Sequence, residues 1–409
     1  MYHQFNRREI LTVGAGAAAI GVNCLVPKTL ATAAHIGETE DKVLVVIQLS
    51  GGNDGLNTVV PLADPLYKKA RPELAISRDS AIRISDSLGL HPSLRLVAKL
   101  FEDGAISILQ NVGYPQPNRS HFESMDIWHT CRRKGESRDE GWLGRALAAD
   151  QTNGGDVAGL HLGGEQQPAA LASRSVRVPS IKSLKEFELR GHNREALAEL
   201  ISRPTPKSKN TQPNALLDFV ASNSMAAVIA SERVTEAASG TLASGYPDNQ
   251  LGEKLRTVAQ LIGSGLSTRV YYVQLDGFDT HAKQAPAHAV LLEQWASALA
   301  AFQSDIREQG NASRVCCMTF SEFGRRVKEN ASGGTDHGAA APLFLCSDAI
   351  QAGIHGSAPD LEDLLDGDLK HSLDFRSVYA GILKDWLKVA PVTALGQEFE
   401  SAQLFSKPA

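Results

Sequence analysis

Residues 42–49, with the sequence KVLVVIQL, constrain the fold of this chain more than any other feature. The apolar residues follow one another without the polar alternation of a strand that has one face in water. Strands of this kind are buried on both faces, as in parallel sheets covered by helices on either side. The segment therefore predicts an α/β protein with a largely parallel sheet.

Other parts of the chain extend this pattern. Residues 291–306 are predicted to be helical, because their apolar side chains recur at steps of three and four. Strands alternating with amphipathic helices predict three layers, α/β/α, with helices on both faces of the sheet. Further strands are predicted for residues 105–110, 269–275, 314–320 and 342–346, and further helices for residues 93–101 and 375–387.

The middle of the chain is less regular. Residues 155–189 carry short apolar pieces separated by glycine and proline, which favours a β-hairpin. A polar, proline-punctuated loop is predicted to follow, and residues 216–238 are predicted to form an Ala/Ser-rich helix. We interpret residues 41–409 as a single domain with a cap inserted around residues 150–245.

The first residues have the character of an export signal. Arg7 and Arg8 precede a modest apolar stretch, and Ala31 and Ala33 follow with the A-x-A spacing that signal peptidase reads. The pattern resembles a twin-arginine signal, a route that carries folded proteins. We expect residues 1–34 to be removed, and the twin-arginine export machinery to deliver the protein to the periplasm or the cell exterior.

Composition argues against several classes of function. The formal net charge of −5 and the isoelectric point near 6.2 give no basis for nucleic-acid binding. No apolar run reaches the length of a membrane span, and no haem, iron–sulfur or dinucleotide motif suggests a redox protein. Cys131 and Cys346 could form a disulfide, but no spacing of the cysteines indicates a disulfide framework. We interpret the cysteines mainly as small core residues.

Acidic residues and histidines follow two of the predicted strands at the point where each strand ends. Asp279 and His281 follow the third strand, and Asp336 and His337 lie in a Gly-flanked loop after the fourth. The carboxyl ends of parallel strands meet at one edge of a sheet, so we expect these donors to come together. Oxygen and nitrogen donors suit Zn²⁺, Mn²⁺ or a mixed pair. The four residues therefore predict a site for one or two divalent ions.

Two choices stay open in this ligand set. Asp276 can replace Asp279 as a ligand. Alternatively, it can accept a hydrogen bond from the His281 ring nitrogen that does not bind the metal and so fix the tautomer of His281. After the first strand, Asp54 can stand at the sheet edge as a further ligand, although an Asp-Gly pair is also a common turn. Four other histidines have no motif around them, and we interpret them as structural. The alternative is that His355 or His371 is an additional metal ligand. These four are His91, His129, His355 and His371.

The residues after the second strand combine a candidate nucleophile with a cation. Ser120 and Glu123 have the spacing of a capping box, so Ser120 is explained as a helix N-cap. The same position suits a nucleophilic hydroxyl activated by a metal and by the helix N-terminus. Arg119 would then clamp an anion, and His121 would act as an acid or an orienting group. Arg325, after the fourth strand, is either part of a solvated charge cluster or a fork for a phosphate or sulfate oxygen.

With these residues assembled, the chain resembles the family called domain of unknown function 1501 over about residues 42–388. Many members of that family carry twin-arginine signals. The resemblance rests on ordered blocks at residues 51–61 (GGNDGLNTVVP), 89–94 (GLHPSL), 112–115 (VGYP), 119–122 (RSHF), 141–145 (GWLGR), 277–281 (GFDTH), 322–325 (EFGR), 335–338 (TDHG) and 374–379 (DFRSVY).

That family in turn resembles the alkaline phosphatase and sulfatase superfamily, which implies a phosphatase-like α/β/α core with one or two divalent ions. The spacing of Asp279 and His281 departs from the superfamily's pattern, and the final histidine of that pattern has no counterpart before the fifth strand. A single-metal or degenerate site is therefore the alternative to a complete two-zinc site. By this resemblance the metal ligands are Asp54, Asp279, His281, Asp336 and His337, and the nucleophile is Ser120.

Taken together, these features predict an exported, metal-dependent hydrolase of phosphate or sulfate esters, with a small molecule or a polymer as substrate. Ser120 would attack phosphorus or sulfur, while Arg119 or Arg325 would neutralise the equatorial oxygens. The alternative is a non-catalytic exported protein whose degenerate site binds an anionic ligand, polymer or partner.

Overall fold

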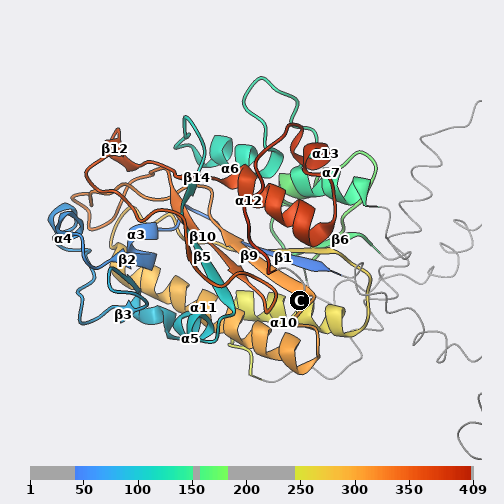
Figure 1. Cartoon of the computed structure of the whole chain (residues 1–409), viewed down its shortest axis with the longest axis horizontal. Coiled ribbons are helices and arrows are strands. Elements are labelled where there is room, and N and C mark those ends of the chain that lie inside the picture. The colour runs from blue at the N-terminus through green and yellow to red at the C-terminus, as the bar shows by residue number, and fades with distance from the viewer. Residues whose placement is uncertain (1–41, 151–156, 183–244, 407–409) are drawn as a thin grey trace, which may run out of the picture. The chain divides into compact units, whose positions relative to one another are not determined.

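The computed structural model describes residues 42–150, 157–182 and 245–406, which build an α/β structure around one large sheet (Figure 1). The described strands lie in the order β11–β5–β10–β9–β1–β8–β6–β7, and β14 pairs with the end of β5. Their bounds are β1 Val43–Leu49, β5 Ile106–Gly113, β6 Gly159–Leu162, β7 Ser180–Ile181, β8 Val270–Leu275, β9 Val315–Phe320, β10 Ala341–Cys346, β11 Gly353–His355 and β14 Leu373–Asp374.

Most neighbouring strands of this sheet run parallel, as the sequence predicts. β1 pairs in parallel with β8 on one side and with β9 on the other, and β6 continues the parallel set beyond β8. The exception is β10, which runs antiparallel to both β9 and β5. Because two antiparallel pairings restore the direction, β5 points the same way as β9. The carboxyl ends of β1, β5, β8 and β9 therefore lie at one edge of the sheet.

Helices cover both faces of the sheet because the strands are apolar on both. In β1, Val43, Val45 and Ile47 pack into one core, whereas Leu44 and Val46 pack into the other. Helices α5, α10 and α11 close the first core, and α6, α7, α12 and α13 close the second (Figure 1). The predicted three-layer α/β/α arrangement is confirmed. The helix bounds are α5 Arg95–Glu102, α6 His121–Thr130, α7 Trp142–Ala149, α10 Gln250–Gly263, α11 Gln284–Glu308, α12 Phe375–Gly381 and α13 Pro391–Leu395.

Shorter elements lie between the main strands and helices. One small sheet has the order β2–β4–β3, and a second pairs β12 with β13. A third apolar cluster, which includes Leu56, Tyr67 and Val327, packs among them. The bounds are α3 Gly55–Thr58, β2 Val59–Pro61, α4 Pro65–Ala70, β3 Ile82–Arg83, β4 Leu88–Leu90, η1 Pro92–Leu94, η2 Ala169–Leu171, β12 Leu364–Leu365, β13 Asp368–Leu369 and the π-helical turn η3 Ile382–Leu387.

The hairpin expected at residues 155–189 is wrong. β6 and β7 run parallel to each other, and β6 pairs with β8, so the described part of this region extends the central sheet. The connection between β6 and β7 contains η2, and it brings β7 back parallel to β6. The two strands of a hairpin are antiparallel and are joined by a short turn. The helix expected at residues 216–238, most of the cap and the signal in residues 1–34 lie outside the described residues.

The described cysteines are core residues. All four are buried free thiols, namely Cys131, Cys316, Cys317 and Cys346. The possible disulfide between Cys131 and Cys346 is therefore not formed. Burial raises the pKa of the Cys131 and Cys346 thiols to about 12, which keeps them protonated. Among the described residues, no helix combines the length and the apolar character needed to cross a bilayer.

Acid should destabilise the fold progressively below about pH 6.5, the ordinary pKa of histidine. Burial lowers the pKa of His129 to about 3 and that of His288 to about 4. Between these values and pH 6.5 the unfolded chain binds more protons than the folded one. The free energy of unfolding should therefore fall by roughly 1.4 kcal/mol per histidine for each pH unit in that window.

Urea unfolding at about pH 7, 6 and 5 measures this dependence. His129 bonds to Gln48 and to Tyr272 inside the core, so His129→Gln keeps a polar partner there and removes the titration. The variant should flatten the pH dependence. An unchanged slope in the variant would contradict the assignment to His129.

Candidate metal centre

Loops from several strands meet at the carboxyl edge of the sheet. The loop after β1 turns through Gly51, whose φ of +116° favours glycine. A Cβ at Gly51 would lie 2.3 Å from the backbone nitrogen of Asp279, so the glycine lets the loops after β1 and β8 pack together. The same edge receives His121 at the start of α6 and His337 between β9 and β10.

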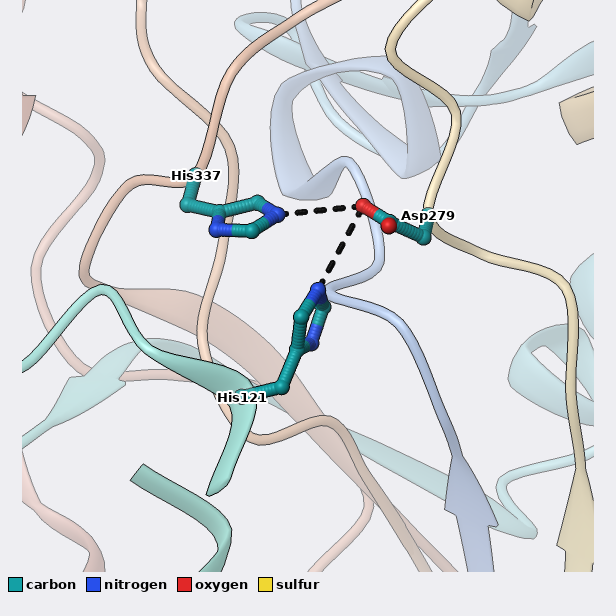
Figure 2. Close-up of side chains that lie close together, drawn as sticks. All are labelled: His121, Asp279 and His337. Atoms are coloured by element: carbon teal, nitrogen blue, oxygen red, sulfur yellow. Dashed lines mark hydrogen bonds and ion pairs between the residues drawn. The ribbon is translucent and has the colours of Figure 1, made fainter. Parts of the chain in front are cut away.

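Three histidine nitrogens converge there on one carboxylate oxygen. Asp279 Oδ1 lies 3.1 Å from His337 Nε2, 3.1 Å from His281 Nε2 and 3.5 Å from His121 Nε2. His281 Nε2 and His337 Nε2 are 2.9 Å apart. Figure 2 shows His121 and His337 each turning a ring nitrogen toward the same Asp279 oxygen. The four donor atoms come from two loops and one helix start and gather around Asp279 Oδ1, and those of His121, Asp279 and His337 all lie within 4.8 Å of one another.

The opposite nitrogen of each ring is held by an oxygen. His121 Nδ1 lies 2.8 Å from Glu322 Oε1, His281 Nδ1 lies 3.2 Å from Asp336 Oδ1, and His337 Nδ1 lies 2.8 Å from the Arg119 carbonyl. Ionised carboxylates and carbonyls only accept, so each Nδ1 carries the proton and donates. In a neutral imidazole, Nε2 is then left with a lone pair that faces the Asp279 carboxylate. This is the arrangement by which proteins orient metal-binding histidines.

The charges and the donor types fit one divalent cation. Asp279, Glu322 and Asp336 carry three negative charges against one positive charge on Arg325, a net of −2. His281 Nε2 and His337 Nε2 lie 2.9 Å apart, so their two lone pairs repel each other unless a proton or a metal cation lies between them. Metal–donor distances of about 2.0–2.1 Å in a tetrahedral site place donors about 3.3 Å apart, close to the separations here. A set rich in imidazole suits Zn²⁺ or a similar transition metal better than Mg²⁺.

The protonation states of two donors follow from their neighbours. Burial acts to raise the pKa of Asp279, but the hydrogen bond and charge of Arg325, with contributions from the His337 and His121 rings, outweigh it and bring the pKa to about 2. The pKa of His121 is raised, chiefly by the hydrogen bond to Glu322, although burial opposes the shift. Asp279 is therefore an anion at every physiological pH, and the His121 ring binds a proton more readily than an ordinary imidazole.

Arg325 is enclosed in the protein, so the expected role as an anion clamp is wrong. The side chain is fully buried, and a guanidinium nitrogen lies 2.7 Å from Asp279 Oδ1. The other hydrogen bonds of the guanidinium go to four backbone carbonyls. These carbonyls belong to Gly51, Gly52, Phe278 and Thr335. Arg325 thus ties three loops together and neutralises Asp279.

Asp54 is also structural, so the expectation that it is a metal ligand is not met. Its carboxylate is buried, accepts a hydrogen bond from Gln284 and forms a 2.5 Å ion pair with Arg71. Burial would raise the pKa of Asp54, but the Arg71 charge and hydrogen bond more than offset it, and the pKa is lowered. Arg71 also donates to the carbonyls of Arg326 and Val327, so it fastens the first loop to a later one.

Ser120 and Arg119 lie beside the donors and face other groups. Ser120 is the N-cap residue of α6, but its side chain makes no capping hydrogen bond, and Glu123 pairs with Arg138 rather than closing a capping box. Ser120 is exposed and lines a hollow of 540 Å³ to which none of the four donors contributes. Arg119 forms a 2.5 Å ion pair with the buried Asp368. The structure therefore does not bring the Ser120 hydroxyl or the Arg119 guanidinium into the donor cluster.

The remaining sequence candidates fall into place around the cluster. Asp336 supports His281 from behind, although the sequence predicts it as a ligand, and Asp276 is exposed outside the cluster. His355 donates to the Gln351 carbonyl, and His371 lines a separate pocket. Among the described residues, the third histidine is instead supplied by the helix start at residue 121.

Glu322 is the residue that sequence reasoning undervalued. It is buried, and one carboxylate oxygen accepts from both His121 Nδ1 and the backbone nitrogen of Gly51. The available signal was its place directly after the predicted strand 314–320, where a side chain can reach the sheet edge.

Asp336→Asn should weaken metal binding by about 10–100-fold without abolishing it, as is typical of a group that holds a ligand from behind. The substitution removes the charge that fixes His281 but leaves all four donors in place. Competition with a chromophoric chelator measures the change. Complete loss of the metal would show that Asp336 is itself a ligand.

Solved structures resemble the chain only loosely. A protein of the alkaline phosphatase superfamily from Vibrio parahaemolyticus is 9% identical with a TM-score of 0.40, covering 88% of this chain and 71% of that chain. The lipoteichoic acid synthase LtaP from Listeria monocytogenes is 7% identical with a TM-score of 0.37, covering 86% and 73%. A mutant of TAB5 alkaline phosphatase with bound Mg is 9% identical with a TM-score of 0.35, covering 76% and 92%. Scores this low carry no argument about activity.

No curated protein matches the sequence. A family model described as protein of unknown function DUF1501 matches residues 41–376. This range holds all four donors and every residue that fixes them from behind. It spans well over half of the chain, and the chain therefore belongs to the DUF1501 family.

Proposed function

We propose that this protein is an exported hydrolase of phosphate or sulfate esters that depends on a single divalent metal. The proposed ligands are His121, Asp279, His281 and His337. The observation that carries the proposal is the convergence of three Nε2 atoms on Asp279 Oδ1, with each Nδ1 fixed by an oxygen behind it. Side chains that merely filled a polar surface would not share this arrangement.

The chemistry follows from the donor set. A divalent ion bound there would supply Lewis-acid stabilisation of charge on phosphoryl or sulfuryl oxygens and would activate water. Glu322 and Asp336 keep the protons on the outer ring nitrogens, so that the inner ones stay available. Arg325 holds Asp279 in place and limits the negative charge near an anionic substrate. We assign the attack to water rather than to Ser120, because Ser120 lines a different hollow.

The export part of the proposal rests on the paired arginines and the A-x-A spacing in residues 1–34. A full-length fusion to a reporter that is active only outside the cytoplasm tests it. Export should be lost when Arg7 and Arg8 are both replaced by lysine. Export that persists in the double variant would exclude the twin-arginine route.

Metal content and ester turnover test the central proposal together. Mass spectrometry of the signal-cleaved protein should find about one divalent ion per chain. After loading with Zn²⁺ or Mn²⁺, the protein should hydrolyse at least one of the p-nitrophenyl esters of phosphate, phosphodiester or sulfate, and chelation should stop the reaction. A protein that takes up neither metal would overturn the proposal.

The second candidate is a metal-containing binding protein without turnover. The observation that favours it is that both arginines expected to stabilise charge on the substrate are paired with carboxylates. Arg119 pairs with Asp368, and Arg325 pairs with Asp279. This alternative expects stoichiometric, metal-dependent binding of phosphate or sulfate and no hydrolysis of any ester in the panel.

A further inference from the structure

A mainly apolar pocket of 200 Å³ lies beside the metal centre. We call it the Phe323 pocket. Its walls are formed mostly by apolar side chains, and His371 and Lys370 also line it. The ammonium of Lys370 is engaged by Asp363. The apolar lining includes Tyr114, Pro117, Phe323, Ala340, Leu365 and Leu369.

Phe323 is shared between this pocket and the donor cluster. Its ring centroid lies 4.9 Å from the His121 ring and 4.8 Å from the His337 ring. The ring cannot turn away from them freely, because it packs so closely on Gly52 that a Cβ there would lie 2.4 Å from a ring carbon. One aromatic side chain therefore forms both a wall of the pocket and a support of two metal donors.

A second hollow lies next to the Phe323 pocket. It shares Gln116, Pro117 and Leu365 with a neighbouring hollow of 440 Å³. That hollow is bordered by Arg119, whose carbonyl holds His337 Nδ1 at 2.8 Å. The two hollows therefore adjoin each other along the loop before α6, and Phe323 and Arg119, which line them, both contact donor histidines.

Size and polarity select what the Phe323 pocket can hold. An apolar cavity of about 150 Å³ in a protein is enough to bind benzene, so 200 Å³ accommodates one six-membered ring with a small substituent. The lining offers few polar groups, so a sugar or another group rich in hydroxyls would lose hydrogen bonds there. A compact apolar ring would lose none.

We infer that the Phe323 pocket binds a compact apolar group, the size of one aromatic ring, on an ester whose anionic head lies at the metal centre. This inference rests on the proposed function and narrows its substrates to aryl or similarly compact apolar esters of phosphate or sulfate. Burying a ring rather than a methyl group should raise affinity by about 10–100-fold.

Binding of two inert anions tests the inference. Calorimetry on the metal-loaded protein compares phenylphosphonate with methylphosphonate, which share a head group and differ only in the apolar part. Phenylphosphonate should bind about 10–100-fold more tightly. Leu365→Trp, at an exposed position that lines both hollows, should obstruct the pocket and bring the two affinities together without changing that of methylphosphonate.

Leu96→Trp is the matched control, because Leu96 is exposed to a similar extent, 43% against 46% for Leu365, and lies on α5 away from the pocket. The control should keep the wild-type preference. Equal affinities in the wild-type protein, or a preference that survives Leu365→Trp, would overturn the inference.

Failure of the proposed function gives a different result. If the metal-loaded protein hydrolyses no ester, the two phosphonate affinities can still be measured and compared. If neither phosphonate binds, phenol is titrated into the metal-free protein and followed by NMR. Phenol shifts at the Phe323 pocket that disappear in Leu365→Trp would support the pocket's selectivity, and their absence would overturn it.

Discussion

His337→Ala should remove the metal from the folded protein and, with it, any ester hydrolysis. His337 Nε2 lies 3.1 Å from Asp279 Oδ1 and 2.9 Å from His281 Nε2, so its loss leaves two imidazoles and one carboxylate. The expected loss of affinity exceeds the roughly 10–100-fold typical of groups that only hold a ligand. Metal content should fall from about one ion per chain to background.

Mass spectrometry of the purified variant checks this result, with circular dichroism to show that the protein is folded. His355→Ala is the control, because His355 is a histidine outside the cluster that donates to a backbone carbonyl. The control should retain its metal. Full metal content or undiminished turnover in His337→Ala would remove His337 from the site and the single-metal mechanism with it.

Arg71→Ala should destabilise the protein by about 3–5 kcal/mol, because it leaves the Asp54 carboxylate buried without its cation. Both side chains are almost completely inaccessible, at 0% and 1% exposure, and their atoms approach to 2.5 Å. The same substitution removes the hydrogen bonds that Arg71 donates to the carbonyls of Arg326 and Val327. The loop between β9 and β10 would lose one of its attachments.

Urea unfolding measures the loss, and Arg83→Ala provides the comparison. The Arg83–Asp86 pair has the same chemistry on the surface, where solvent screens it, so the control should leave the unfolding midpoint unchanged. Metal content per folded chain should not change in either variant. A fully stable Arg71→Ala protein would contradict the structural role of the Asp54–Arg71 pair.

The central fold was predictable because its strands are apolar on both faces. Residues 42–49 and 314–320 predict β1 and β9 to within one residue, since short apolar runs rich in β-branched residues favour strands that are buried on both faces. The direction of β10 was not predictable, because direction depends on the connection that precedes a strand. The parallel pairing of β6 and β7 was not predictable for the same reason.

The candidate site was only partly predictable from sequence. Strand ends correctly placed Asp279, His281 and His337 at one edge, where the structure brings them together. The partner of a buried charge cannot be inferred from composition. Nothing in the sequence shows that Asp54 faces Arg71 and not a metal.

The hydrogen bonds of Arg325 have a consequence for how the metal arrives. They join the loops after β1, β8 and β9 through backbone carbonyls. The donors are therefore preorganised by the polypeptide itself, unlike those of small zinc domains that unfold when the metal is withdrawn. For the proposed metal centre we therefore expect chelation and unfolding to be separable events, so that one divalent ion can be exchanged for another in a chain that stays folded.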